Sequence, residues 1–182
     1  MKVTPLKIPD VLLIEPRVFE DARGFFFESF REDIFRNETS LDVSFVQDNH
    51  SRSSQGVLRG LHYQLPPHAQ GKLVRVIQGE ILDIAVDIRE SSPTCGKYIA
   101  EILSSHNKKQ LYIPEGFAHG FLTLSENSEY LYKTTDFYHP QSERCIIWND
   151  SALNIAWPKD LNIRLSSKDL LGKRFKTTPL FP

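Results

Sequence analysis

Apolar and polar residues alternate along most of the chain with the two-residue period of β-strands. Within 81–88 every even-numbered position is aliphatic, whereas the odd-numbered positions mix aliphatic residues with Asp83 and Asp87. Turn residues separate this run from other short strand-like segments at 45–51, 56–64, 72–78, 98–103, 111–113, 117–124, 130–138 and 145–148. The pattern predicts an all-β sandwich or barrel.

The two ends of the chain are more mixed. The run 11–19 is interrupted by Pro16, which favours an edge strand. After a turn at 21–24, the aromatic run 25–30 is strand-like, and 31–37 predicts a short helix with Ile34 and Phe35 on its inner face. We expect short strands at 153–157 and 163–165, then a short helix or ordered tail at 166–175.

Composition narrows the class of protein. A chain of 182 residues with 40% hydrophobic and 25% charged residues is typical of one globular domain, here 1–182. A formal net charge of −1 gives no field to attract nucleic acid. Two cysteines without metal-type spacing, no apolar signal core and no membrane-length run predict a cytoplasmic protein without membrane contact.

The segment GVLRGLHYQ at 56–64 is the strongest candidate for chemistry. A lone histidine in an apolar strand is usually a core residue, but His62 has Arg59 and Lys72 nearby in sequence and a second glycine-framed histidine, His119, downstream. Since imidazole titrates near neutral pH, we interpret His62 as a general base in a barrel pocket. Arg59 and His62 can share that pocket only if the strand bulges near Gly60.

Residues 114–119 read P-x-G-x-x-H and resemble the second motif of the cupin superfamily. We therefore expect an eight-stranded cupin-type jelly roll, a double-stranded β-helix barrel with a short C-terminal helical segment. Metal-binding cupins carry H-x-H in their first motif, but the matching place here reads His62-Tyr63-Gln64. With that ligand missing, we predict neither a catalytic metal nor another cofactor.

Other polar residues allow two interpretations each. Lys72 alternates with Val74 and Val76, so it either extends to solvent from a strand end or lines the barrel. By parity, Tyr130, Tyr132 and Tyr138 fall on one face of their segment, where simple packing would account for at least one of them.

Taken together, long segments resemble the dTDP-4-dehydrorhamnose 3,5-epimerase family. They are DARGFFFESF (21–30), FVQDNHSRSSQGVLRGLHYQ (45–64), GKLVRVIQGEILDIAVDIRESSPTCGKY (71–98), LYIPEGFAHGFLTLS (111–125) and YKTTDFYHPQSERCIIWND (132–150). The resemblance implies a metal-free cupin homodimer acting on a dTDP-4-keto-6-deoxyhexose. It also implies that part of the 25–30 strand reaches the partner subunit's site.

The resemblance also implies residue roles. His62 would be the base, Asp169 of the short match 166–169 its partner, Tyr132 the acid on the far ring face and Lys72 the cation at the enolate oxygen. Substrate contacts would come from Arg23, Glu28, Gln47, Asp48, Asn49, Arg59, His119, Tyr138, Glu143 and Lys168. Asp83 would hold His119 through a hydrogen bond.

Several alternatives remain open at this stage. A single-centre epimerase or a ketoisomerase would act on the same sugar and share most of these residues. A sugar-binding cupin without catalysis would not need His62, Tyr132 and Lys72 together. A metal-dependent dioxygenase cupin would need the ligand that Gln64 replaces.

Overall fold

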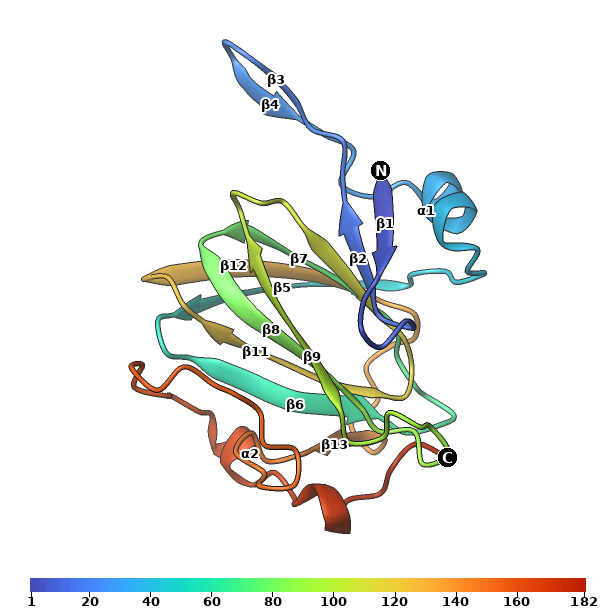
Figure 1. The fold of residues 1–182 in the computed structure, drawn as a ribbon, viewed down its shortest axis with the longest axis vertical. Coiled ribbons are helices and arrows are strands. Elements are labelled where there is room, and N and C mark those ends of the chain that lie inside the picture. The colour runs from blue at the N-terminus through green and yellow to red at the C-terminus, as the bar shows by residue number, and fades with distance from the viewer.

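The computed structural model describes residues 1–182 as two antiparallel sheets that face each other (Figure 1). One sheet has the spatial order β1 (Lys2–Pro5), β2 (Leu12–Glu15), β10 (Gln110–Ile113), β7 (Lys72–Gln78), β12 (Asn127–Thr134) and β5 (Gln47–Ser54). The other has the order β13 (Glu143–Cys145), β6 (Leu58–Gln64), β11 (Phe117–Thr123), β8 (Glu80–Asp87) and β9 (Tyr98–Ser104). The predicted all-β jelly roll is confirmed.

From β5 to β8, and again from β9 to β13, consecutive strands alternate between the two sheets. β7 and β8 are separated only by Gly79, yet they belong to different sheets. At Gly79 the backbone φ is +76°, and a Cβ would lie 2.0 Å from the carbonyl oxygen of Asn127, so only glycine fits this crossing. The alternation of β8 then has two consequences: Ile81 and Ala85 face the barrel interior, whereas Ile84 and Val86 face the opposite side.

Three apolar clusters hold the layers together. The largest fills the barrel between the sheets and includes Val74, Leu111 and Phe121. On the outside of the six-stranded sheet, α1 (Glu32–Thr39) buries Phe35, as its helical spacing predicts. The C-terminal segment covers the outside of the five-stranded sheet with α2 (Ser167–Leu170) and a 3₁₀ turn, η1 (Phe175–Thr177). Neither α-helix is long enough to cross a bilayer.

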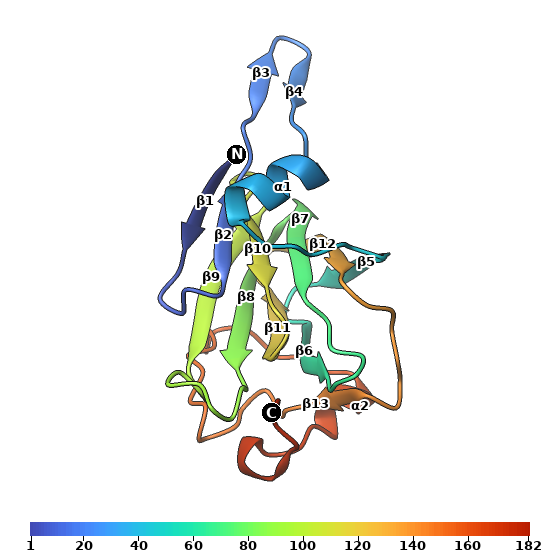
Figure 2. The ribbon, with the colours of Figure 1, turned by 90° about the vertical axis from the view of Figure 1, so that its right-hand side faces the viewer.

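A two-stranded hairpin, β3 (Phe19–Asp21) and β4 (Gly24–Phe26), projects beyond the barrel (Figure 2). Its turn lies at the predicted position, between Asp21 and Gly24. Phe19, Phe25 and Phe26 are 50%, 59% and 66% exposed. Such an aromatic surface is unusual in a monomer and is typical of an interface.

Three details differ from the sequence-based expectations. β2 lies between β1 and β10 and is not an edge strand, because Pro16 falls after its last residue. The strand in 25–30 ends at Phe26, and the following residues lead into α1. The runs 153–157 and 163–165 form no strands; they pack against the sheet largely through side chains such as Leu153, together with an isolated bridge at Arg164.

Candidate active site

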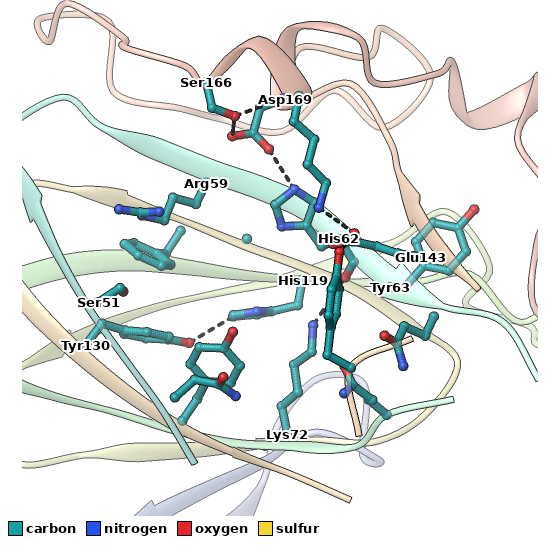
Figure 3. A pocket seen from close by; sticks show the side chains of 18 of the residues that line it. Ser51, Arg59, His62, Tyr63, Lys72, His119, Tyr130, Glu143, Ser166 and Asp169 are labelled. Carbon is teal, nitrogen blue, oxygen red and sulfur yellow. Dashed lines mark hydrogen bonds and ion pairs between the residues drawn. The ribbon is translucent and has the colours of Figure 1, made fainter. Parts of the chain in front are cut away.

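A cavity of about 400 Å³ opens between the two sheets, and α2 lies over one side of it (Figure 3). The five-stranded sheet contributes residues of β6, β11 and β13, and the six-stranded sheet contributes residues of β5, β7 and β12. The predicted site residues that line it are Asn49, Arg59, His62, Lys72, His119, Tyr132, Tyr138, Glu143, Lys168 and Asp169. The volume is in the range that binds small organic ligands.

The expected bulge in β6 is present. His62 pairs with His119 and Arg59 pairs with Phe121, so an interval of three positions in β6 lies opposite an interval of two positions in β11. The extra residue reverses the parity between Arg59 and His62, and both side chains therefore line the cavity. The interruption falls at Gly60, whose φ is +126°.

His62 and Asp169 form a close pair. His62 Nε2 lies 2.6 Å from Asp169 Oδ1, and Ser166 Oγ donates to Asp169 Oδ2 over 2.7 Å. Burial alone would raise the pKa of Asp169, but the hydrogen bonds from His62 and Ser166 hold it below its usual value. An ionised carboxylate only accepts, so Nε2 carries the ring proton and Nδ1 keeps a free lone pair.

A second histidine–carboxylate pair is formed by His119 of β11, which lies next to His62 in the sheet, and Asp83 of β8. His119 Nε2 is 3.0 Å from Asp83 Oδ1 and 3.2 Å from the Tyr130 hydroxyl. Burial lowers the pKa of His119, and Asp83 offsets only part of that effect. His119 is therefore a neutral side chain with a fixed orientation, and its predicted contact with Asp83 is present in the structure.

Lys72 lines the barrel and does not extend to solvent. Its side chain is almost fully buried, and Nζ donates to the His62 carbonyl oxygen over 3.4 Å. Burial lowers the pKa of Lys72 to about 8, although Glu143 and Asp83 favour its charged form. A cation with this pKa can both stabilise an adjacent oxyanion and lose its charge in mildly alkaline solution.

The other wall carries Tyr132, opposite the strand of His62. Burial and the neighbouring Glu143 raise the pKa of Tyr132, which keeps its hydroxyl protonated at neutral pH. Tyr138 lies beyond the end of β12, so strand parity does not apply to it; it reaches the cavity from a loop and donates to Glu143 over 2.8 Å. Glu143 also accepts from Lys168 of α2.

Four predicted contact residues do not line this cavity. Asp48 faces the other side of β5, where it pairs with Lys133 at 2.8 Å. Gln47 holds two lining residues in place: its Nε2 donates to Asn49 Oδ1, and its Oε1 accepts from the backbone N–H of Tyr138. Arg23 and Glu28 belong to the projecting hairpin and the segment after it, where they pair with Asp21 and Arg31.

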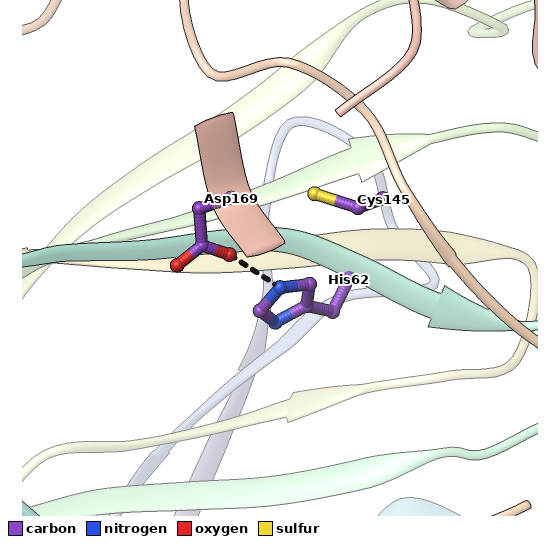
Figure 4. A group of neighbouring side chains, drawn as sticks. All are labelled: His62, Cys145 and Asp169. Carbon is purple, nitrogen blue, oxygen red and sulfur yellow. Dashed lines mark hydrogen bonds and ion pairs between the residues drawn. The ribbon is translucent and has the colours of Figure 1, made fainter. Parts of the chain in front are cut away.

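Among the residues that sequence reasoning missed are Ser166 and Tyr130, which line the cavity, and Cys145, which lies next to it. Ser166 begins the matched segment 166–169 and caps α2, so the motif could have identified it. Packing was expected to account for at least one of the three tyrosines and Tyr130 was given no role at the site, but it lines the cavity and its hydroxyl donates to Asp83. Cys145 lies beside His62 and Asp169, and the ligand atoms of the three residues are within 4.8 Å of one another (Figure 4). No local spacing reveals this group, because the three residues come from distant segments.

Gln64 occupies the place of the second histidine of metal-binding cupins and is fully engaged. Its side-chain amide donates to the carbonyl oxygens of His68 and Phe137, and its oxygen accepts from the backbone of His139. These bonds connect the loop that contains His68 with the loop that contains Phe137 and His139, so the Gln64 side chain stabilises the two loops and is not free to bind a metal.

Comparison with known proteins gives a consistent result. Residues 5–177 match the family model described as dTDP-4-dehydrorhamnose 3,5-epimerase. The chain is 59% identical to the protein of that name from Pseudomonas aeruginosa, over 100% of both chains.

Two solved structures are also similar. The 3,5-epimerase from Legionella pneumophila in complex with dTDP-4-keto-L-rhamnose has a TM-score of 0.94 at 47% identity, covering 98% of this chain and 94% of that one. A 3'-monoepimerase from Streptomyces bikiniensis in complex with dTDP-quinovose has a TM-score of 0.90 at 32% identity, covering 97% and 88%.

Proposed function

Because the chain belongs to the family of dTDP-4-dehydrorhamnose 3,5-epimerases and is therefore an isomerase, we propose the following substrate and residue roles. It converts dTDP-4-dehydro-6-deoxy-D-glucose to dTDP-4-dehydro-L-rhamnose by inverting C5 and C3. The C4 ketone acidifies the hydrogens on both neighbouring carbons. Removal of either proton gives an enolate, and reprotonation from the opposite ring face inverts that carbon.

One observation supports the proposal most strongly: the His62–Asp169 pair stands on one wall, while Tyr132 and Lys72 come from the opposing sheet. His62 Nδ1 accepts the proton from carbon, and Asp169 stabilises the imidazolium that forms. Tyr132 returns a proton from the other side of the ring. The Lys72 ammonium stabilises the enolate oxygen.

The remaining cavity residues suit a sugar nucleotide. Arg59 and Lys168 supply positive charge for the diphosphate. The Asn49 amide nitrogen is buried without a hydrogen-bond partner, so it can donate to a substrate oxygen. His119, Tyr138 and Glu143 complete the contacts.

The proposal includes a cytoplasmic homodimer. In a symmetric pair, the exposed aromatic hairpin of one subunit covers the other subunit, and Arg23 and Glu28 then reach the partner's cavity. The two free cysteines fit a reducing compartment.

A single-centre epimerase is a second candidate, because the 3'-monoepimerase has the same fold. Incubation of the enzyme with dTDP-4-dehydro-6-deoxy-D-glucose in deuterated water separates the two. We expect deuterium at C3 and C5, with both centres inverted in the NMR spectrum of the product. Exchange and inversion at C3 alone identify a monoepimerase, and no exchange at either carbon overturns the proposal.

A further inference from the structure

Cys145 lies directly opposite His62 on adjacent antiparallel strands, since β13 pairs with β6 in the register Cys145↔His62. Residues in such a pair project to the same side of the sheet, with Cβ atoms about 5 Å apart. The thiol therefore lies beside the imidazole of the proposed base, where epimerisation itself has no need of a sulfur atom.

The third member of the group comes from α2, which is fixed over this strand pair. Lys173 donates its backbone N–H to the Cys145 carbonyl oxygen over 2.9 Å, and Ile147 donates to Lys173 over 2.9 Å. These bonds hold the end of the α2 segment against β13. The Asp169 carboxylate is consequently held over His62, and the imidazole, thiol and carboxylate converge (Figure 4).

We propose that Cys145, His62 and Asp169 form an inhibitory site for a thiophilic divalent cation, with Zn²⁺ as the best match. One nitrogen, one sulfur and one carboxylate oxygen are ligands that Zn²⁺ accepts, and His62 and Asp169 also line the open cavity, which leaves a fourth position for water. Tetrahedral zinc ligands lie roughly 3.3–3.8 Å apart. The 2.6 Å contact between His62 and Asp169 must widen and the Cys145 thiol must approach, both by small side-chain movements.

The cation would block catalysis by changing the tautomer of His62. Binding replaces the thiol proton, which leaves to solvent, and the Nε2 proton, whose place on the ring moves to Nδ1, so one proton is released in all. A neutral metal-bound imidazole keeps its one proton on Nδ1, the atom that accepts the substrate proton in the proposed mechanism. The base thus loses its lone pair. Mg²⁺ and Ca²⁺ prefer oxygen ligands and should have no such effect.

The chain offers a matched control for the thiol. Cys95 is also partly buried and free, but it lies in the loop between β8 and β9 and belongs to no group of metal ligands. Cys145→Ser and Cys95→Ser each remove one sulfur. Only the first should affect cation binding.

The inhibitory effect rests on the proposed function, so the test needs a readout that is independent of activity. Chelator-treated wild type, Cys145→Ser and Cys95→Ser are each titrated with Co²⁺, and thiolate-to-cobalt charge transfer is followed in the near ultraviolet. We expect the band in wild type and Cys95→Ser, with about one cation per chain, and its absence in Cys145→Ser. Zn²⁺ should displace Co²⁺ and remove the band.

The same three proteins are then assayed with Zn²⁺ and with Mg²⁺, each normalised to its own activity in chelator. Zn²⁺ should inhibit wild type and Cys95→Ser reversibly, and Cys145→Ser should need at least about 10-fold more Zn²⁺. A cobalt band that survives Cys145→Ser overturns the site. If wild type shows the cobalt band and epimerase activity but Zn²⁺ does not inhibit it, the inhibitory role is wrong. If wild type shows the cobalt band but has no activity on the dTDP sugar, the cation site stands and the proposed function is wrong.

Discussion

Gly60 of β6 and Gly120 of β11 face each other so closely that a Cβ on Gly60 would lie 2.6 Å from the Cα of Gly120. A Cβ on Gly120 would meet the Arg59 carbonyl oxygen at the same distance. This backbone contact sits at the bulge that places Arg59 and His62 in one cavity. The pair of glycines is therefore a structural condition for the site.

Gly60→Ala should destabilise the protein and lower its activity, because the new methyl group must push β6 away from β11. The cost is on the order of 1–3 kcal/mol in the free energy of unfolding, measured by urea denaturation. For the loss of stability, Gly24→Ala is the control for backbone strain: its φ is also +126°, but within its own chain nothing lies within 4 Å of the added Cβ. Equal losses in the two variants would show that the close approach to Gly120 carries no energetic weight.

The titration of Lys72 predicts an alkaline limit to activity. Burial lowers the pKa of Lys72 to about 8, so its charge, and with it the stabilisation of the enolate, should be lost above that pH. Lys72→Met should lower kcat by roughly 10²–10³-fold, the range for removal of one oxyanion-stabilising group, and abolish this limb of the pH–rate profile.

Stability should not follow the same course. Between pH 8 and the ordinary value of 10.5, the unfolded chain holds more protons at Lys72 than the native protein does, so the contribution of Lys72 to stability rises with pH. Circular dichroism should therefore report a folded enzyme while the rate declines. An alkaline loss that coincides with unfolding would contradict the assignment.

Much of this arrangement could be predicted from sequence, because alternation marks strands and because the motifs name His62, Lys72, Tyr132 and Asp169. The bulge at Gly60 was also predictable, since parity alone cannot bring Arg59 and His62 together. What alternation does not encode is which strands pair: β7 and β8 are adjacent in sequence but lie in opposite sheets.

Where the structure differs from the sequence-based expectations, the reason is again how strands pair and which way side chains face. Apolar runs such as 153–157 look like strands, but their side chains are buried by packing on a sheet face without a ladder of backbone bonds. Asp48 was expected at the substrate, yet strand alternation turns it toward Lys133 while Asn49 faces the cavity. The neighbourhood of Cys145 and His62 depends on the pairing of β13 with β6, which no local pattern indicates.

Exhaustive chelation should not lower epimerase activity. The position that supplies a second histidine in metal-binding cupins is Gln64, whose amide group is occupied by three loop contacts. The measurement is activity after dialysis against a chelator, with metal content determined by elemental analysis. Activity that disappears on chelation and returns with one divalent cation would contradict a metal-free mechanism.

The shared site of the proposed dimer predicts complementation between two inactive variants. Arg23, with a side chain that is 90% exposed, would act only in the partner's cavity, whereas His62 acts in its own. Arg23→Ala and His62→Asn homodimers should both be weak. After subunit exchange, a mixed dimer has one site with an intact His62 and an intact partner Arg23, so an equal mixture should regain about a quarter of wild-type activity. If Arg23 served its own cavity, mixing would restore nothing.

Variants of His62 and Tyr132 should fail in different ways, because the two residues stand on opposite walls of the cavity and, in the proposed mechanism, transfer the proton at different steps. His62→Asn removes the base and should abolish both deuterium exchange and epimerisation, a loss on the order of 10²–10⁴-fold. Tyr132→Phe keeps the ring and its packing but deletes the hydroxyl that donates from the far face. This variant should still form the enolate and return solvent deuterium from the His62 side, so C3 and C5 become labelled while little inverted product appears.

Tyr138→Phe is the necessary control, since the Tyr138 hydroxyl contacts Glu143 at the cavity mouth and its removal should affect substrate binding more than inversion. NMR of the recovered sugar nucleotide reports label and configuration together. If Tyr132→Phe inverts both centres at the wild-type rate while Tyr138→Phe does not, then Tyr138 is the proton donor and the role proposed for Tyr132 is wrong.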